Sequence, residues 1–290
     1  MKCLLCESDR SRLIWRQNGS RIERCGGCGV LFTVNPPSQA ELNALYEDGK
    51  LTGVPTERIG LENGPPPAWK QREHEVILER LKRLGVSGGA LLDVGAFDGM
   101  FLKNAKRSGF DATGVEPLRE AYLHVRDTLG LNLVHGDLHS AAFPPGSFAA
   151  VTLLDVIEHI ADPVEELREV FRLLKPGGVL VMTTPNAAGL MQRVVGTKRK
   201  IFGQPWCPID DIPWHLWGFT PPTIRLCAER AGFRVDSVVP LEPSPLSTNQ
   251  DLGSTGWKKA ALRAAAEASK LLRMSDRMMG FALKGEADRS

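Results

Sequence analysis

The sequence lacks a strong charge imbalance, a long apolar run and a secretory leader. Its 36 basic and 34 acidic side chains leave a formal net charge of +2, so bulk attraction to nucleic acid or to an anionic membrane is not indicated. No apolar stretch approaches the roughly 18–20 residues of a membrane-spanning helix, and the N-terminal residues run directly into charged positions. We therefore expect a cytoplasmic protein in a reducing environment, without a transmembrane segment.

Cysteine is scarce, yet four of the 6 cysteines form two CxxC pairs. Each pair places two sulfurs on one side of a tight turn, and four thiolates satisfy a tetrahedral zinc ion. A redox pair, or buried or disulfide-bonded cysteines, are the alternatives, but the paired spacing and the expected location favour structural zinc. We predict a zinc-ribbon module over residues 1–36, with short strands near residues 13–15, 21–24 and 30–32. Its predicted ligands are Cys3, Cys6, Cys25 and Cys28.

A helical linker is predicted over residues 37–88. Ser38 and Glu41 have the spacing of a capping box at the start of a short helix to Tyr46. Residues 48–67 are rich in glycine and proline and favour a loop, whereas apolar residues recur at helical spacing from residue 68 to 84. We expect this second helix to cover the cofactor site of the main domain.

The main domain, residues 89–290, alternates short apolar runs with helical periodicity. This alternation predicts an α/β fold with a doubly wound, mostly parallel seven-stranded sheet and helices on both faces. A Lys-Pro-Gly-Gly turn is expected at residues 175–178, before the fifth strand. The predicted strands cover residues 90–93, 112–115, 131–134, 149–154, 179–183, 234–239 and 277–284, and the predicted helices cover residues 99–108, 118–129, 162–174 and a segment ending at residue 231.

Each of the first four strands of this domain ends in an acidic side chain: Asp93, Glu116, Asp137 and Asp155. These strand ends meet at the edge where open α/β sheets bind ligands. Glu116 lies 23 residues after Asp93, a separation at which an acid reaches a ribose diol, and Asp137 is placed to accept from an exocyclic amine of a base. Any one of these acids alone is equally well explained as a solvated turn residue. Four in register favour a nucleoside-containing ligand.

The loop after the first strand carries Gly95 and Gly99 but lacks the spacing that holds a pyrophosphate. In the dinucleotide fingerprint GxGxxG the middle glycine admits the pyrophosphate. Here Phe97 and Met100 occupy the second and third glycine positions, so a dinucleotide fits poorly. A cofactor without phosphates is favoured, and an acid near the loop suits the cationic amino-acid group of S-adenosylmethionine.

Five ordered motifs resemble those of class I S-adenosylmethionine-dependent methyltransferases, and the resemblance covers roughly residues 69–284. The cysteine-rich start, continuing into Asn-Pro-Pro-Ser at residues 35–38, is similar to a subgroup that acts on sugars, lipids and other small metabolites. The run around residues 155–178 is more specific than the glycine loop. The motifs are Leu-Leu-Asp-Val-Gly-x-x-x-Gly at residues 91–99, Gly-Val-Glu-Pro at 114–117, His-Gly-Asp-Leu at 135–138, Asp-Val-Ile-Glu-His-Ile at 155–160 and Leu-Leu-Lys-Pro-Gly-Gly at 173–178.

The resemblance implies a role for each motif residue. Glu116 would hold the ribose hydroxyls, and Asp155 would line the methyl-transfer mouth. Phe97 departs from the family, which usually has glycine there, and its ring would tighten or partly cover the methionine pocket. The cofactor-binding residues implied are Asp93, Gly95, Phe97 and Gly99 at the methionine end, Glu116 at the ribose, Asp137 and the backbone of Leu138 at the adenine, and Asp155 at the mouth.

Two histidines are candidate bases for a hydroxyl or carbon acceptor. His159 follows the fourth strand, beside the expected methyl site, and a structural role for it is about as well supported. His215 lies in an aromatic-rich segment within an insert at about residues 186–220, where the family closes its acceptor pocket. We therefore favour His215 for the acceptor site, and the predicted catalytic set is His215, His159 and Asp155.

The insert offers further candidates with equally simple alternatives. Trp206, Trp214, Trp217 and Phe219 form either a pocket wall or a satellite core. Two interpretations apply to Arg193 and the basic run at residues 198–200: they bind an anion, or they form a solvated face. The solvated face is slightly favoured. A helix at residues 257–272 is expected to pack on the domain, although a partner subunit or a membrane surface are alternatives.

These patterns predict methyl transfer to a small-molecule acceptor, for example a sugar or nucleotide-sugar, at oxygen, carbon or nitrogen. We expect a monomer or homodimer that does not bind nucleic acid. An RNA methyltransferase gripping RNA with its ribbon is the first alternative, but acidic residues within residues 3–28 speak against it. A non-catalytic cofactor-binding scaffold is the second, and Phe97 is its only support.

Overall fold

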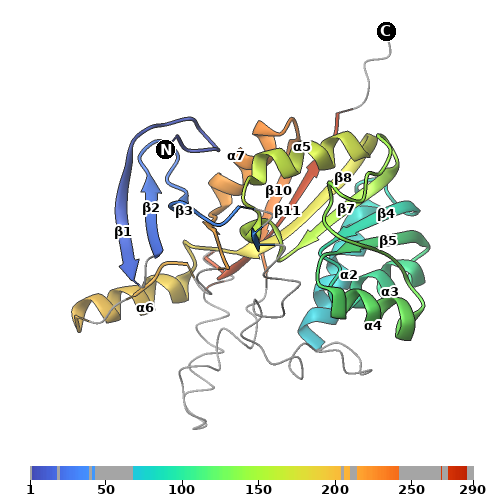
Figure 1. The fold of residues 1–290 in the computed structure, drawn as a ribbon, viewed down its shortest axis with the longest axis horizontal. Coiled ribbons are helices and arrows are strands. Elements are labelled where there is room, and N and C mark those ends of the chain that lie inside the picture. Colours follow the sequence, from blue (N-terminus) through green and yellow to red (C-terminus); the bar gives the residue numbers. More distant parts are fainter. Residues whose placement is uncertain are drawn as a thin grey trace.

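The larger sheet of the molecule has seven strands in the order β10-β11-β8-β7-β4-β5-β6. The computed structural model describes residues 2–17, 20–38, 41–42, 68–203, 206–209, 214–241, 269 and 274–285. Within them the predicted fold class is confirmed (Figure 1). The strands are β4 (Gly89–Val94), β5 (Phe110–Glu116), β6 (Asn132–His135), β7 (Phe148–Leu154), β8 (Leu174–Pro185), β10 (Arg234–Pro240) and β11 (Arg277–Leu283).

The chain order of the strands creates a switch point between β4 and β7. The chain runs outward from β4 to β5 and β6, then returns to the other side of β4 to form β7, and all these pairings are parallel. Open sheets of this kind bind ligands outside the carboxyl ends of the strands at such a point. The last strand, β11, runs antiparallel to both β8 and β10. The topology therefore places the candidate site at the ends of β4 and β7.

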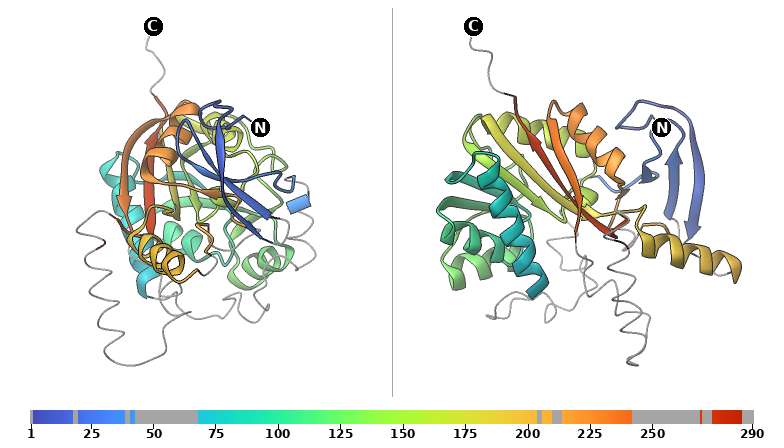
Figure 2. Two further views of the ribbon diagram at one scale, coloured as in Figure 1. Left: turned by 90° about the vertical axis from the view of Figure 1, so that its left-hand side faces the viewer. Right: turned by 180° about the vertical axis from the view of Figure 1, so that it is seen from behind.

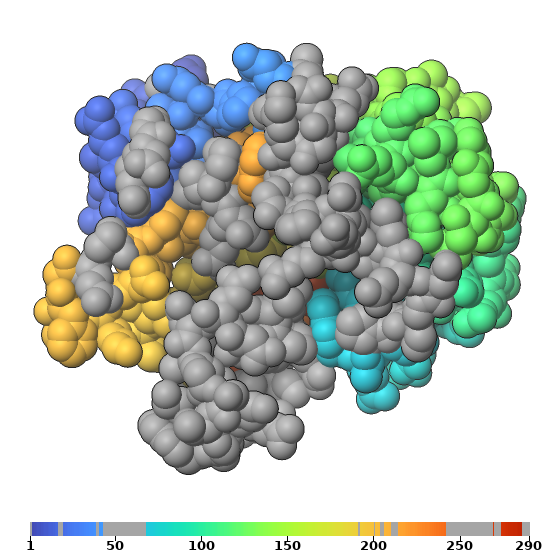
Figure 3. Space-filling model, turned by 60° about the horizontal axis from the view of Figure 1, so that its bottom comes forward, coloured from blue at the N-terminus to red at the C-terminus, as the bar shows by residue number. Residues whose placement is uncertain are grey.

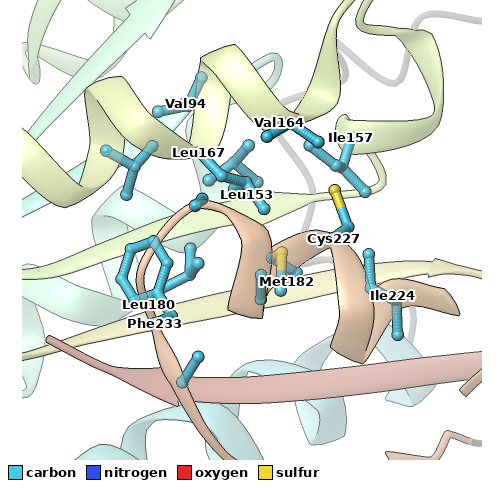
Figure 4. Close-up of a cluster of buried hydrophobic side chains, with 14 of the residues drawn as sticks. Val94, Leu153, Ile157, Val164, Leu167, Leu180, Met182, Ile224, Cys227 and Phe233 are labelled. Carbon is cyan, nitrogen blue, oxygen red and sulfur yellow. The ribbon is translucent and has the colours of Figure 1, made fainter. Parts of the chain in front are cut away.

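Helices cover both faces of this sheet (Figures 1 and 2). Successive strand residues point to opposite faces, so Leu92 and Val94 of β4 join one buried cluster while Leu91 joins another. The first cluster includes Leu167 of α5 and Cys227 of α7, as Figure 4 shows. One face carries α2 (Ala68–Arg83), α3 (Met100–Arg107) and α4 (Arg119–Leu129), and the other carries α5 (Pro163–Leu173) and α7 (Pro221–Arg230).

The start of β8 corrects one prediction. Residues 175–178 do not form a separate turn but belong to β8, which begins at Leu174. The backbone N–H of Gly177 donates to the carbonyl of Lys284 at 3.1 Å, and the Lys284 N–H donates to the carbonyl of Gly178 at 2.9 Å. These long-range hydrogen bonds include a proline- and glycine-containing stretch in the strand, although Gly177 has a φ of 74° and the pairing with β7 is irregular here.

A second, smaller sheet joins the N-terminal segment to the insert. The predicted ribbon strands are confirmed as β1 (Ser11–Gln17), β2 (Ser20–Cys25) and β3 (Leu31–Thr33). A fourth strand, β9 (Trp217–Gly218), pairs antiparallel with β3 and was not foreseen. The division into units 1–36, 37–88 and 89–290 stays a prediction, but several buried side chains of the ribbon, such as Cys25 and Phe32, share one cluster with the main domain.

The insert also contains α6 (Leu190–Ile201), which lies at the surface beside the ribbon (Figure 3). The capping box is present, since the Ser38 N–H donates to the Glu41 carboxylate at 2.8 Å. The remainder of that predicted helix, the loop at 48–67 and the predicted helix at 257–272 lie outside the described residues, apart from Ser269. Among the helices that are described, none is long and apolar enough to cross a membrane.

Candidate functional site

The loops after β4, β5 and β6 are tied together by backbone hydrogen bonds. The N–H groups of Gly95 and Ala96 donate to the carbonyl of Val115, at 2.9 and 3.2 Å. The N–H of Gly136 donates to the carbonyl of Glu116 at 3.0 Å. These bonds gather the acids predicted from the sequence at the same edge of the sheet.

The loop after β4 needs glycine at two positions. Gly95 and Gly99 have φ angles of 70° and 68°, in the left-handed region. A Cβ on Gly95 would lie 2.6 Å from a methyl group of Val156, which follows β7. Phe97 between them also has a positive φ, 43°, although it is not glycine, and its side chain is 38% exposed. The predicted contact of Phe97 with the methionine stays a prediction.

Glu116 is buried at the end of β5 and faces the glycine loop. Its carboxylate accepts hydrogen bonds from the backbone N–H groups of Phe97 and Leu118, both at 2.8 Å. Burial raises the pKa of Glu116 to about 7, although these two hydrogen bonds oppose the rise. The carboxylate therefore sits beside the loop, with one remaining lone-pair direction on each oxygen for a diol.

Asp93 ends β4 and is also buried. It accepts a hydrogen bond from the Thr152 hydroxyl at 2.6 Å. Burial raises the pKa of Asp93 to about 7 against this bond, and the neighbouring Asp98 and Glu116 raise it further. Such a carboxyl group ionises readily when a cation arrives beside it.

Asp137 and Leu138 lie in a tight turn after β6. The Ser140 N–H donates to the Asp137 carboxylate at 2.8 Å, and the Asp137 N–H donates to the Ser140 hydroxyl at 3.0 Å. Leu138 is buried. These contacts do not test adenine binding, so the binding of adenine by Asp137 and Leu138 stays a prediction.

Asp155 is enclosed by cations that sequence reasoning missed. One guanidinium nitrogen of Arg277 donates to both carboxylate oxygens of Asp155, at 2.7 and 2.5 Å, and the Lys70 ammonium lies 3.1 Å from one of them. Arg277 also pairs with buried Glu73 at 2.6 Å. Burial alone would raise the pKa of Asp155, but Arg277 and Lys70 hold it below its usual range. The geometry makes Asp155 a poor proton acceptor, so its predicted catalytic role would be positioning.

Only weak signals in the sequence point to these partners. Lys70 and Glu73 are three residues apart and share one face of α2. Arg277 is the first residue of β11, and an arginine at the start of a buried strand needs a carboxylate partner. Neither signal identifies Asp155 as that partner.

The structure brings the two predicted histidines together. The rings of His159 and His215 have centroids 4.7 Å apart and an interplanar angle of 62°. Nδ1 of His159 lies 3.1 Å from the carbonyl oxygen of Trp214, so this nitrogen carries the proton and Nε2 keeps its lone pair. Burial, with His215 nearby, lowers the pKa of His159 to about 4, which keeps the ring neutral at pH 7.

Glu158 completes this group. Its side chain is 1% exposed, and neither carboxylate oxygen has a hydrogen-bond partner among the described residues. Burial raises the pKa of Glu158 to about 8 and the charge of Asp155 adds to the rise, while the nearby Thr184 hydroxyl, outside hydrogen-bond geometry, and Arg277 oppose it. One oxygen of Glu158 and one nitrogen of each of His159 and His215 lie within 4.8 Å of one another.

Two aromatic side chains of the insert are buried. Trp217 and Phe219 are buried and stack at 6.1 Å, and Trp217 donates through its indole N–H to the carbonyl of Ile160 at 2.9 Å. Both belong to the buried core cluster, and Trp217 also lines a pocket. A small pocket lies between His215 and Asn186. The basic residues of α6 lie on an exposed or half-exposed face, and Lys200 has no described side chain.

The four predicted cysteine ligands also converge. The sulfur atoms of Cys3 and Cys28 are 3.7 Å apart, and those of Cys6 and Cys25 are 3.4 Å apart. Burial acts to raise the pKa of Cys25, but hydrogen bonds to its sulfur, including backbone N–H groups of Cys28 and Gly27, lower it to about 6. Four sulfur atoms at this spacing fit a tetrahedral zinc ion.

Comparison with known proteins agrees with this geometry. Residues 68–238, more than half of the chain, match the family described as a methyltransferase domain. The ubiquinone biosynthesis O-methyltransferase of Psychrobacter arcticus is 29% identical over 58% of this chain and 68% of its own length. That of Pseudomonas fluorescens is 33% identical over 36% of this chain, which spans about half, 48%, of the relative. An S-adenosylmethionine-dependent methyltransferase structure from Mesorhizobium loti has a TM-score of 0.52 at 17% identity, covering 76% of this chain and all 100% of that one, and this likeness shows the fold alone.

The fold is that of class I S-adenosylmethionine-dependent methyltransferases. By its family match, the chain belongs to the methyltransferase-domain family, and S-adenosylmethionine is its cofactor.

Proposed function

We propose that this protein transfers the methyl group of S-adenosylmethionine to a hydroxyl oxygen of a small-molecule acceptor. The observation that carries the proposal is the pair of His159 and His215 just beyond the carboxyl end of β7, where their rings approach to 4.7 Å. The relatives named as O-methyltransferases support oxygen as the acceptor atom. Phenols, sugars and nucleotide-sugars all present such a hydroxyl group.

The transfer is an in-line displacement. A lone pair of the acceptor oxygen forms a bond to the methyl carbon, the carbon–sulfur bond breaks, and the sulfonium becomes the neutral thioether S-adenosylhomocysteine. The acceptor hydroxyl transfers its proton to the histidine pair, in the simplest case to an unprotonated ring nitrogen. Alignment of nucleophile, methyl and sulfur supplies up to about 7–11 kcal/mol of the barrier reduction, and proton removal typically adds ~10²–10⁴-fold.

We propose a role for each cofactor-binding residue. Glu116 would accept the two ribose hydroxyl hydrogen bonds, and Asp93 would face the cationic amino group through the glycine loop. Asp137 and the backbone of Leu138 would bind the adenine. The Asp155 carboxylate, held by Arg277, would fix the shape of the mouth between cofactor and acceptor.

We further propose a structural zinc ion on Cys3, Cys6, Cys25 and Cys28. The support is the convergence of the four sulfur atoms and the N–H of Gly27, which donates to the Cys25 sulfur at 3.3 Å. A Cβ on Gly27 would lie 3.0 Å from the Cys6 sulfur, so glycine keeps the ligand pocket open.

The test is incubation of the protein with labelled S-adenosylmethionine and a panel of phenols, sugars, nucleotide-sugars and lipid alcohols. We expect label in at least one hydroxyl compound. His215→Ala should lower turnover at least tenfold while changing cofactor affinity little, and His139→Ala, which removes a half-exposed histidine paired with Glu166, serves as the control. Unchanged turnover in His215→Ala would remove His215 from the mechanism.

A further inference from the structure

Glu158 presents a buried acid whose polar atoms lack partners. Its side chain is 1% exposed, and both oxygens are without a hydrogen bond among the described residues. An uncompensated buried carboxyl group costs stability in either protonation state, because the ion is desolvated and the neutral acid still has a proton to donate. Nearby Asp155 does not help, since its oxygens accept from Arg277, Lys70 and Thr183. A cation bound beside Glu158 would compensate the cost of burying its carboxylate.

Two nitrogen atoms adjoin this carboxylate. One ligand atom from each of Glu158, His159 and His215 lies within 4.8 Å of the other two. His159 is already oriented in the way of a metal ligand, because Nδ1 donates to the backbone carbonyl of Trp214 at 3.1 Å and leaves Nε2 for a metal. The two segments are also joined by the Leu216 N–H, which donates to the carbonyl of Glu158 at 2.8 Å.

We propose that Glu158, His159 and His215 bind a divalent first-row transition-metal ion at the acceptor site. Two imidazoles and one carboxylate suit Zn²⁺, Mn²⁺, Fe²⁺ or Co²⁺. Three protein ligands leave positions open, as in catalytic rather than structural metal sites. The four-cysteine cluster is separate, since its soft thiolates form another group.

The bound ion would activate the acceptor hydroxyl, and the histidines would hold the ion. This role of the ion rests on the proposed O-methyl transfer. An acceptor hydroxyl that coordinates the ion has a lowered pKa and releases its proton to solvent. The resulting oxyanion forms the bond to the methyl carbon as the carbon–sulfur bond breaks. The histidines then act as ligands and not as the base, and acceptors with a second oxygen beside the hydroxyl, such as catechols and vicinal diols, are favoured because they chelate.

Metal binding is tested without turnover. The full chain is loaded with zinc at the cysteines, freed of loosely bound metal, and titrated with Mn²⁺ while the electron paramagnetic resonance signal of free Mn²⁺ is followed. Co²⁺ is the second probe, read by absorption without thiolate charge transfer. We expect one equivalent of bound metal in the wild type, and a dissociation constant raised at least tenfold in both Glu158→Gln and His215→Ala.

The matched control is Glu166→Gln, which removes a buried carboxylate beside another histidine, His139, 3.1 Å away. It should bind metal as the wild type does, with circular dichroism confirming the fold of each variant. Absence of metal binding with both probes, or wild-type binding in Glu158→Gln and His215→Ala, overturns the proposal.

The two proposals separate in the turnover assay. Methyl transfer to a hydroxyl compound that persists after the loosely bound metal is removed, with the cysteine-bound zinc retained, supports the proposed function and overturns the proposed role of the metal in activating the hydroxyl. Metal binding at Glu158 without methylation of any hydroxyl compound leaves the metal site supported and overturns O-methyl transfer.

Discussion

Phe97 holds a backbone conformation that favours glycine. Its φ of 43° lies in the left-handed region, which costs a residue with a Cβ about 1–2 kcal/mol. Phe97→Ala removes the ring but keeps the Cβ, whereas Phe97→Gly removes both. We expect Phe97→Gly to exceed Phe97→Ala in free energy of unfolding by roughly 0.5–1 kcal/mol, after the greater freedom of glycine in the unfolded chain is subtracted.

Urea denaturation of the two variants measures this difference directly. Both lack the half-exposed ring, so loss of ring contacts cancels in the comparison. If Phe97→Ala proves the more stable, the loop does not hold the strain that its φ angle implies. Cofactor affinity of the same pair reports whether the ring itself contacts the methionine end.

The two buried acids predict a pH dependence of cofactor binding. Burial raises the pKa of both Asp93 and Glu116 to about 7 in the free protein; Asp98 raises both values further, and Lys70 lowers that of Asp93. Hydroxyl donors and a cation favour the ionised carboxylates, so binding S-adenosylmethionine should release protons. We expect affinity to rise as pH increases from 6 to 7.5, by up to about tenfold per pH unit for one proton.

Calorimetry in two buffers of different ionisation enthalpy counts the released protons. Glu116→Gln should bind more weakly and release fewer. Proton release that is zero at pH 6.5 would contradict the prediction. The sign for folding is the reverse: carboxyl groups with raised pKa hold protons in the folded state, so their contribution to stability falls between about pH 4 and 7.

At the scale of elements, Arg277 anchors α2 and β11 to the end of β7. Arg277 is 7% exposed, and its guanidinium pairs with Glu73 of α2 and with Asp155. Arg277→Ala would leave the buried Glu73 carboxylate with only the longer contact to Lys70, at 3.5 Å. We expect a loss of about 3–5 kcal/mol in the free energy of unfolding, the usual cost of removing one partner of a buried ion pair.

Arg83→Ala on the same helix is the control for Arg277→Ala. Arg83 pairs with Glu79 at 3.5 Å, but the two side chains are 69% and 67% exposed. Its removal should change stability by less than about 1 kcal/mol, because exposed ion pairs contribute little. Equal effects of the two substitutions in thermal denaturation would show that the network around Asp155 is not buried as described.

The helices and strands were predicted accurately where the apolar residues of a segment recur with the period of a helix or a strand. The five parallel strands and the helices between them follow from apolar runs and their capping residues, such as Asp162, which accepts from two backbone N–H groups at the start of α5. The prediction failed where pairing decides the conformation. Residues 175–178 join β8 through the hydrogen bonds of Gly177 and Gly178 with Lys284, and β9 is two residues long and pairs with β3.

At the scale of the molecule, the ribbon supports the acceptor side of the site. Phe32 of β3 lies opposite Trp217 of β9, and the Thr33 N–H donates to the carbonyl of Leu216 at 2.8 Å. Leu216 follows His215 directly. The buried cluster also contains Cys25, so the proposed zinc ion and the position of His215 depend on the same packing.

Removal of the ribbon metal should therefore affect both stability and turnover. We expect a strong chelator, or Cys25→Ser, to lower the melting temperature by roughly 5–10 °C, the equivalent of a few kcal/mol in a chain of this size. Turnover should fall together with stability, because β3 no longer holds β9. Differential scanning calorimetry and the methyl-transfer assay measure the two effects.

Cys207→Ser is the control for this experiment, since Cys207 lies outside the four-cysteine group. It should keep both the metal and the melting temperature. Full activity at 25 °C after the ribbon zinc is lost would show that the ribbon and the acceptor site are not coupled.

The sequence by itself determined the fold class and the cofactor, and it indicated the four cysteines that converge in the structure. Each depends on local order: alternating strands and helices, acids at strand ends, glycines at fixed positions and CxxC spacing. Of the candidate site, it indicated the cofactor-facing acids and both histidines, because each follows a recognisable strand or motif. Their individual roles stay predictions.

Only the tertiary structure decided which side chains meet across the sheet. Lys70, Glu73 and Arg277 surround Asp155 although they are separated by up to 204 residues. Glu158 adjoins His215 because β9 folds back beside the end of β7. Charge compensation and burial depend on distances between remote segments, and a linear pattern contains no such distances. That is why the acid environment, the metal-ligand triad and the dependence on the ribbon appear only in the folded chain.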